Sequence, residues 1–388
     1  MTAAKHVRSR PRLRPRVLAV AGDAQCAADR IIAELGSAAP ALVLVFAAEG
    51  ALLAPLTGRL SEAFGPDCRV LGCSSAGSFA FGGYRDDRVV AIAFPAAAFR
   101  AEAVWLRDLR QHMALDWIRT LRRLASGFGG VEPGWARFGL LMIDGLCQRE
   151  EVVVAAVDAA LADLPVIGGS AGDGLLFRRT HLALDGESHG ESAIFCLVAS
   201  AFPVEEVVFD HFTPTSERMV VTDALPEQRV ILSINAEPAA EEYARLIGVE
   251  EAALGPRAFA AHPLLARQAG RHVVRSIQAV TPERGLSLMS SVEAGTTMTL
   301  GRAENLTEGL EARMSALGPT ALILGFDCVL RRIALEQAGL GRSVGRIYRE
   351  HRVAGFNTYG EQHGGLHVNQ TFVGLAFLEP DGLRAQAD

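Results

Sequence analysis

The sequence predicts an α/β protein made of two packed α/β domains with mixed sheets. In the first half, apolar runs of strand length alternate with amphipathic helical segments, which is the order of a βαβ protein. Near residue 225 this rhythm changes to strand, turn and helix, and 388 residues exceed what one ordinary core accommodates. We therefore predict domains at residues 17–225 and 226–380, between a disordered basic arm at 1–16 and a tail at 381–388.

The first half begins with a βαβ unit. Residues 41–46 form a continuous apolar run suited to a sheet covered on both faces, and residues 69–72 return as a second strand. This second strand ends on small polar residues, at the strand terminus where ligands usually dock in such sheets. The other helices expected in this half are residues 24–35, 52–64, 113–124 and 150–161, and the other strands are 87–94, 138–143, 192–198 and 204–213.

A short motif occurs twice in this half. Leu71-Gly72-Cys73-Ser74-Ser75-Ala76-Gly77 is similar to Ile167-Gly168-Gly169-Ser170-Ala171-Gly172. The similarity indicates an internal duplication, with chance likeness in a glycine-rich chain as the alternative.

The second half predicts a mixed sheet with three helices. A strand at 229–234 leads into a helix at 238–247 that has proline in its first turn. The remaining expected elements are strands at 273–279, 286–290, 297–299, 320–326 and 372–377 and helices at 305–317 and 331–337.

Composition excludes several classes of protein. The net charge is −6 with acids and bases interspersed, so no surface-wide field favours nucleic acid or an anionic membrane. No window approaches eighteen uninterrupted apolar residues, so we expect no membrane span. The six cysteines form no CxxC pair and four lie among apolar or small residues, which is typical of reduced, buried thiols and of a cytoplasmic protein.

The segment at residues 354–372 has the composition of a binding site. It combines two His, two Asn, two Gln, two Thr, a Glu and a Tyr with glycines, and it leads into an apolar strand. Glycines allow the backbone to approach a bound group, and the polar side chains can donate, accept or ligate. The alternative is a polar hairpin whose groups bond one another and water.

Few residues suit catalysis. The sequence contains no GxSxG, HExxH, P-loop or dinucleotide-binding motif. Cys73 would be an activated thiol if backbone amides lowered its pKa, but no His lies near it in sequence and packing among small residues is the alternative. His211 follows an apolar strand and precedes Phe212, so it suits either an axial haem ligand in an aromatic pocket or an ordinary buried histidine.

Several separated motifs resemble the FIST family. Gly72-Cys73-Ser74-Ser75-Ala76-Gly77 followed by Gly83-Tyr84 resembles a signature of FIST N domains. Asn235-Ala236-Glu237-Pro238-Ala239 with Tyr243 resembles the start of FIST C, and Gly355-Phe356-Asn357-Thr358-Tyr359-Gly360-Glu361 with His367-Val368-Asn369-Gln370-Thr371 resembles its end. The resemblance covers residues 20 to 378 and implies a FIST N-like domain followed by a FIST C-like domain.

Within that family the chain looks most similar to the NosP-type branch. The matching stretches include Gly168-Gly169-Ser170-Ala171-Gly172-Asp173-Gly174, His211-Phe212 and Asp327-Cys328-Val329-Leu330-Arg331-Arg332. This resemblance implies a haem-binding nitric oxide sensor that acts on a histidine kinase or a cyclic-di-GMP enzyme. The chain departs from the pattern at Ser290 and Ser291, at Phe326 and at Ser78, where the family carries cysteines and a glutamate, so roles that need those thiols are in doubt.

Together these observations predict a non-enzymatic cytoplasmic sensor with one ligand recess between the two domains. We expect haem as cofactor, His211 as first choice and His367 as second choice of axial ligand, and signalling through a separate partner chain. The residues expected to wall the recess are Cys73, Ser74, Ser75, Gly169, Ser170, Asp173, Asn357, Tyr359, Glu361 and Asn369. One alternative is a haem-free sensor of an amino acid recognised by Asn357, Glu361 and Asn369, and another is a cysteine enzyme that uses Cys73.

Overall fold

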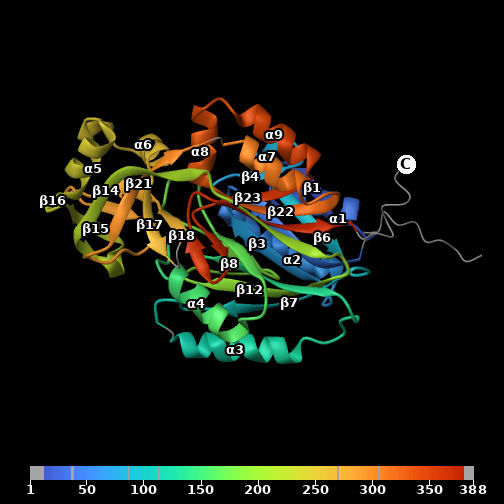
Figure 1. The fold of residues 1–388 in the computed structure, drawn as a ribbon. Helices are drawn as coiled ribbons and strands as arrows, with labels where there is room; N and C mark the ends of the chain where they lie inside the picture. Colours follow the sequence, from blue (N-terminus) through green and yellow to red (C-terminus); the bar gives the residue numbers. More distant parts are fainter. Residues whose placement is uncertain are drawn as a thin grey trace, which may run out of the picture.

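Figure 1 shows the computed structural model, which describes residues 13–35, 39–85, 87–111, 113–268, 271–304 and 306–379. Most of the predicted basic arm and the whole predicted tail lie outside these residues. The arm ends earlier than predicted, because Arg16 already belongs to strand β1 (Arg16–Val20) and Arg14 Nε lies 2.8 Å from Glu379 Oε1.

Three six-stranded sheets share one strand order. In each sheet a parallel pair is flanked on one side by two antiparallel strands and on the other side by an antiparallel hairpin. The first sheet has the order β1, β6 (Val89–Pro95), β2 (Pro40–Ala47), β3 (Arg69–Ser74), β10 (Leu182–Leu184), β11 (Glu187–His189). The second has the order β7 (Phe99–Leu106), β12 (Ala193–Ser200), β8 (Ala136–Ile143), β9 (Val166–Ser170), β24 (Glu361–His363), β25 (Leu366–Val368). The third has the order β13 (Val204–Phe209), β26 (Phe372–Leu378), β22 (Thr320–Cys328), β23 (Val353–Thr358), β4 (Ser78–Ala80), β5 (Gly83–Tyr84).

The hairpins are exchanged cyclically among the three sheets. Hairpin β4–β5 follows β3 of the first sheet but pairs with β23 of the third. Hairpin β10–β11 follows β9 of the second sheet but pairs with β3 of the first, and β24–β25 follows β23 but pairs with β9 of the second. The two similar motifs thus lie at equivalent positions, as the predicted duplication requires, and a third unit completes the set.

Helices cover the outer faces of these sheets, and the inner faces share one core. The covering helices are α1 (Ala24–Leu35) and α2 (Leu53–Phe64) on the first sheet, α3 (Ala114–Gly127) and α4 (Glu150–Leu161) on the second, and α7 (Glu308–Ser315), α8 (Val329–Gln337) and α9 (Gly341–Glu350) on the third. The shared core contains Phe46, Met142 and Phe326, one from each parallel pair. All eight residues of β2 are buried, which confirms a strand covered on both faces.

Residues 212–303 form an eight-stranded sheet with its own core, and we call this part the inserted subdomain. It lies at the left of Figure 1, with Tyr243 and Phe259 buried in its core. Its elements are β14 (Phe212–Leu225), β15 (Val230–Ile234), β16 (Glu237–Pro238), α5 (Ala239–Ile247), α6 (Pro256–Ala261), β17 (Leu264–Gln268), β18 (Arg271–Arg275), β19 (Ile277–Val280), β20 (Leu286–Leu288) and β21 (Thr297–Ala303). The subdomain also contains the 3-10 turns Pro226–Gln228 and Glu251–Ala253, and the main body contains the 3-10 turn Gly50–Leu52.

This arrangement differs from the predicted split into residues 17–225 and 226–380. The sheet changes at Phe212, not at residue 225, because β14 pairs with β15 and β21. The chain from β22 onward returns to the first body, where β26 pairs with β13 and β23 pairs with β4. A linear division of the sequence therefore does not separate the sheets.

Individual elements agree with the sequence to different degrees. Helices α1 and α4 have the predicted bounds. Residues 354–372 comprise most of strand β23 and then the hairpin β24–β25, which agrees with the polar hairpin given as the alternative. The strand expected at 204–213 breaks at Asp210 and His211. Among the described residues, no helix is both long and apolar enough to cross a membrane.

Candidate functional site

The loops that follow the three parallel pairs meet at the centre of the molecule. Ser74, Ser170 and Asn357 occupy equivalent strand ends, and each donates its backbone N–H to one neighbouring loop and accepts from another through its carbonyl oxygen. The six bonds of this central ring are Ser74 N to His181 O 2.9 Å, Gly172 N to Ser74 O 3.1 Å, Ser170 N to Gly360 O 2.8 Å, Tyr359 N to Ser170 O 3.1 Å, Asn357 N to Gly77 O 2.7 Å, and Ala76 N to Asn357 O 2.9 Å. The sequence motifs from both halves are thus brought together, as expected.

Most polar side chains near the central ring form hydrogen bonds within the protein and do not line the predicted ligand recess. Glu361 is fully buried, where Thr358 Oγ1 donates to one carboxyl oxygen and Thr371 N donates to the other at 3.2 Å. Burial raises the pKa of this carboxyl well above its ordinary value. Asn357 Nδ2 donates to Asp327 O at 3.1 Å, and Ser290 Oγ donates to Asn369 Oδ1 at 3.2 Å. None of these three predicted ligand residues lines a described cavity.

Asp173 and Tyr359 organise the loop between β9 and β10. The Tyr359 hydroxyl donates to Asp173 Oδ1, and the carboxylate also accepts the backbone N–H groups of Phe177, Arg178 and Arg179 at 2.8 to 2.9 Å. Partial burial raises the pKa of Asp173, but these bonds to its charged form outweigh burial and hold the pKa below its ordinary value. Asp173 is therefore engaged within the protein.

An open cleft lies beside the central ring. It has a volume of about 300 Å³ and adjoins a second hollow of about 600 Å³ with which it shares Leu175, Ile333 and Glu336. We call the two together the α8 cleft. Its walls are Ala48 and Ser75–Gly77 from the first sheet, Gly174 and Leu175 from the β9–β10 loop, α8, and residues 253 to 257 of the inserted subdomain. Of the predicted ligand residues only Ser75 lines it, whereas Cys73, Ser74, Gly169 and Ser170 lie in or at the ends of their strands.

His211 is a buried imidazole without hydrogen bonds. Only 4% of its surface is exposed, neither ring nitrogen has a hydrogen-bond partner, and the Phe212 ring centroid lies 4.0 Å from its own. Burial and the nearby Arg331 charge lower the pKa of His211 to about 2, so the ring is neutral at physiological pH. Val208 and Asp210 line a cavity of about 530 Å³ together with His272, Val273 and Val274 of β18 and residues of the β24–β25 hairpin, and we call it the β18–β25 cavity.

His367 lies at a different place, under the start of α4. Its Nδ1 is 3.4 Å from Gln362 Nε2, and its Nε2 has no hydrogen-bond partner. Burial lowers its pKa, although the carboxylates of Glu150 and Glu151 oppose that shift. Sequence reasoning did not single out these carboxylates, which bind Arg229 of the inserted subdomain and so join it to the main body.

Cys73 does not have the environment of an activated thiol. It is fully buried in β3, with its Sγ 3.1 Å from Ser74 O. Burial raises its pKa well above the ordinary value, which disfavours the reactive thiolate. All six cysteines are free thiols, and five of them are buried.

Sequence comparison gives the class of this architecture. A FIST N domain matches residues 41–237, and a FIST C domain matches residues 239–363. The chain therefore belongs to the FIST family, whose domains are sensory domains of signalling proteins. No curated protein matches the sequence.

Proposed function

We propose that this chain is a non-enzymatic cytoplasmic sensor that binds haem through His211 to detect nitric oxide. The signal would pass to a histidine kinase or a cyclic-di-GMP enzyme. The observation that carries the proposal is the state of His211, which is neutral, nearly buried and without a hydrogen-bond partner on either nitrogen. A buried imidazole ordinarily has a partner, so this one is free to ligate.

The surrounding residues suit a flat apolar group. The rings of Phe209 and Phe212 flank the imidazole, with centroids 6.4 and 4.0 Å from its own. The β18–β25 cavity is lined at the same strand end by Val208 and Asp210, and not by His211 itself. Its volume of about 530 Å³ is within the usual range for cofactor sites. When bound, ferrous haem supplies a coordination position for a diatomic gas. His211 would hold the iron while the aromatic side chains exclude water.

The positions at which the chain lacks family cysteines are filled by other contacts. Ser290 bonds Asn369, and Phe326 packs against Phe356 with ring centroids 5.6 Å apart. Thiol ligation at these positions is therefore not part of the proposal.

Haem binding is tested with protein purified in the presence of haem. We expect a Soret band in the wild type that is lost or shifted in His211→Ala. The control is His189→Ala, which changes a half-buried histidine on β11 and should retain the band. His367→Ala tests the second choice of ligand. Absence of the band from the wild type, or its survival unchanged in both His211→Ala and His367→Ala, would defeat the proposal.

The α8 cleft supports a second candidate, a haem-free sensor of a small metabolite such as an amino acid. Arg332 and Glu336, whose Nε and Oε1 are 2.7 Å apart, offer opposite charges to a zwitterion beside the backbone of residues 75 to 77. A thermal-shift screen of amino acids on haem-free protein separates the candidates. A specific ligand should raise the melting temperature of the wild type but raise that of Glu336→Gln less.

A further inference from the structure

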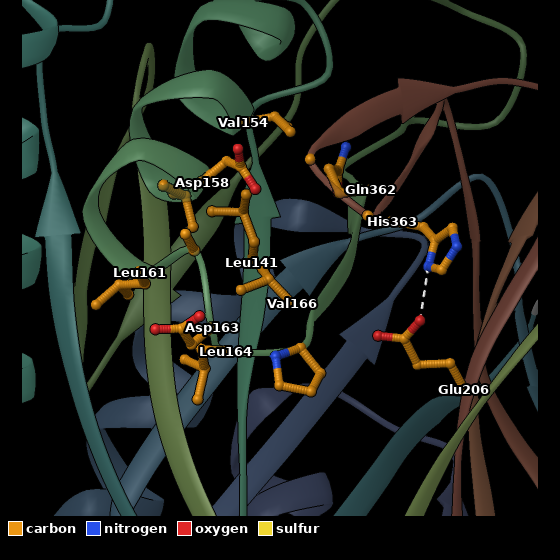
Figure 2. Close-up of a pocket in the computed structure, with 15 residues that line it drawn as sticks. Leu141, Val154, Asp158, Leu161, Asp163, Leu164, Val166, Glu206, Gln362 and His363 are labelled. Carbon is orange, nitrogen blue, oxygen red and sulfur yellow. Dashed lines mark ion pairs between the residues drawn. The ribbon is translucent and has the colours of Figure 1, made fainter. Parts of the chain in front are cut away.

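A cavity of about 310 Å³ lies between α4 and the β24–β25 hairpin. It shares His363 and Gly364 with the β18–β25 cavity, but neither His211 nor His367 lines it. Figure 2 shows it, with Val154, Asp158 and Leu161 of α4 on one side and Gln362 and His363 of β24 on the other. Leu141, Leu164 and Val166 provide apolar walls. The cavity is thus partly apolar and large enough for a small organic ligand.

The charges around this cavity are acidic. Asp158, Asp163 and Glu206 line it, and none of the described lining residues is a lysine or an arginine. His363 Nδ1 lies 3.0 Å from Glu206 Oε2, whereas the carboxylates of Asp158 and Asp163 have no ion-pair partner among the described residues. Helix α4 ends here, and the carbonyl groups at a helix C-terminus add further negative potential.

Gln362 provides a second observation, independent of the acidic residues. Its side chain is fully buried and lies on the face of the second sheet that carries Leu141 and Val166, because Gln362 pairs with Gly168 on β9. Its Nε2 donates to Ser170 Oγ at 2.9 Å, which fixes the amide orientation. Its Oε1 has no hydrogen-bond partner, and a buried unpaired carbonyl oxygen is costly. A hydrogen-bond donor on a ligand would satisfy it.

The glycines of the hairpin turn bring the backbone close to Asp158. Gly365 has φ +72°, and a Cβ at this position would come within 2.9 Å of Asp158 Oδ1. A side chain there would therefore fill the space beside the carboxylate, and glycine keeps it open.

We propose that this cavity binds a small organic ammonium ion with an aliphatic chain, its charge held by Asp158 and Gln362 Oε1 and its chain held by Leu141, Leu161 and Val166. The ammonium group supplies only donors, which matches an acceptor-only set of carboxylate and amide oxygens. The apolar walls favour an alkyl chain over a hydrated metal ion. A ligand that carries its own carboxylate would meet three acidic side chains, which distinguishes this site from the amino-acid site discussed for the α8 cleft.

The test uses calorimetric titration of the haem-free full chain with propyl- to hexylammonium and 1,4-diammoniobutane. We expect at least one of these cations to bind, and 1-butanol and butyrate not to bind. Asp158→Asn should weaken binding by about tenfold or more, because a neutral amide oxygen replaces the charged acceptor of the ammonium group. Asp67→Asn in the exposed turn before β3 should leave binding unchanged.

A blocking pair avoids disturbing the core. Ala162 and Ala159 are both exposed near the end of α4, but only Ala162 lines the cavity. Ala162→Trp should abolish binding, and Ala159→Trp should retain it. The proposal is overturned if no cation of the series binds, if butanol binds as well as butylammonium, or if Ala162→Trp binds like Ala159→Trp. Because haem is absent, these outcomes are independent of the role of His211.

Discussion

Asp327 and Arg331 form an ion pair in which both side chains are fully buried, with Oδ1 and Nη1 2.8 Å apart. Tyr348 Oη donates to the second carboxylate oxygen at 2.8 Å, and Tyr84 Oη donates to it at 3.3 Å. Tyr84 belongs to the exchanged hairpin β4–β5, and Asp327 lies at the end of β22. This network therefore connects two segments that are far apart in the sequence.

Arg331→Met should therefore be strongly destabilising. It leaves Asp327 as an uncompensated buried charge, and breaking a buried pair from one side costs about 3–5 kcal/mol. Urea unfolding gives the free energy directly. The matched control is Arg346→Met, which removes ion pairs of a half-exposed arginine with Glu311 and Glu350 and should change stability little. Equal unfolding midpoints for the two variants would contradict the role given to the buried pair.

The stability of the haem-free protein should fall in acid partly because of His211. Its folded pKa is about 2 against an ordinary value of 6.5, so the unfolded state binds the extra proton. The stabilisation is complete above pH 6.5 and is lost as the pH falls toward 2. Well below pH 6.5, the wild type should lose about 1.4 kcal/mol more per pH unit than His211→Phe. Urea unfolding between pH 7 and pH 4 measures this difference, and parallel profiles for the two proteins would exclude it.

Much of the local structure could be predicted from the sequence, because the spacing of apolar residues indicates which face of a helix or strand is buried. Helix α4 shows its buried face at Val153, Val154 and Val157, and its predicted bounds are confirmed. Helix α9 was not predicted. It buries Val344, Ile347 and Tyr348, but two of its ten residues are glycines, which lower the intrinsic helix propensity of the segment.

The arrangement of the sheets could not be predicted, because strand exchange leaves no local signal. The residues around Glu361 do not predict that its strand pairs with the strand of Gly169, almost two hundred residues earlier. The site shows the same limit. The polar composition of residues 354–372 indicated function, but Glu361 and Asn357 satisfy buried groups within the protein. The unpaired Oε1 of Gln362 depends on three-dimensional contacts that periodicity does not report.

Equivalent glycines in two of the three sheets should differ in their tolerance of a side chain. A Cβ at Gly168 would overlap the carbonyl oxygen of Leu141, which belongs to the rigid neighbouring strand. A Cβ at Gly72 would meet side-chain methyl groups of Leu53 and Thr57 at 3.1 Å and of Ala183 at 3.4 Å. Gly72→Ala should cost about 1–3 kcal/mol as ordinary overpacking, and Gly168→Ala should cost more. Thermal unfolding of both variants checks the order, and the reverse order would be inconsistent with the exchanged-sheet packing.

The contact between Arg229 and α4 should control how firmly the inserted subdomain is attached. Arg229 is buried, donates to Glu150 and Glu151, and also donates to Met289 O at 2.8 Å. Arg229→Met leaves the buried carboxylate of Glu150 unpaired, so the subdomain should separate more often from the main body.

This separation should appear as faster proteolytic cleavage in residues 212–303, read by mass spectrometry of the first fragments. Arg284→Met is the matched control, because Arg284 forms its ion pairs with Glu241 and Glu251 inside the subdomain. Cleavage of Arg229→Met at the same rate and sites as Arg284→Met would rule out a role in attachment. Faster cleavage confined to the first variant would identify the α4 junction as the contact that holds the inserted subdomain against the main body.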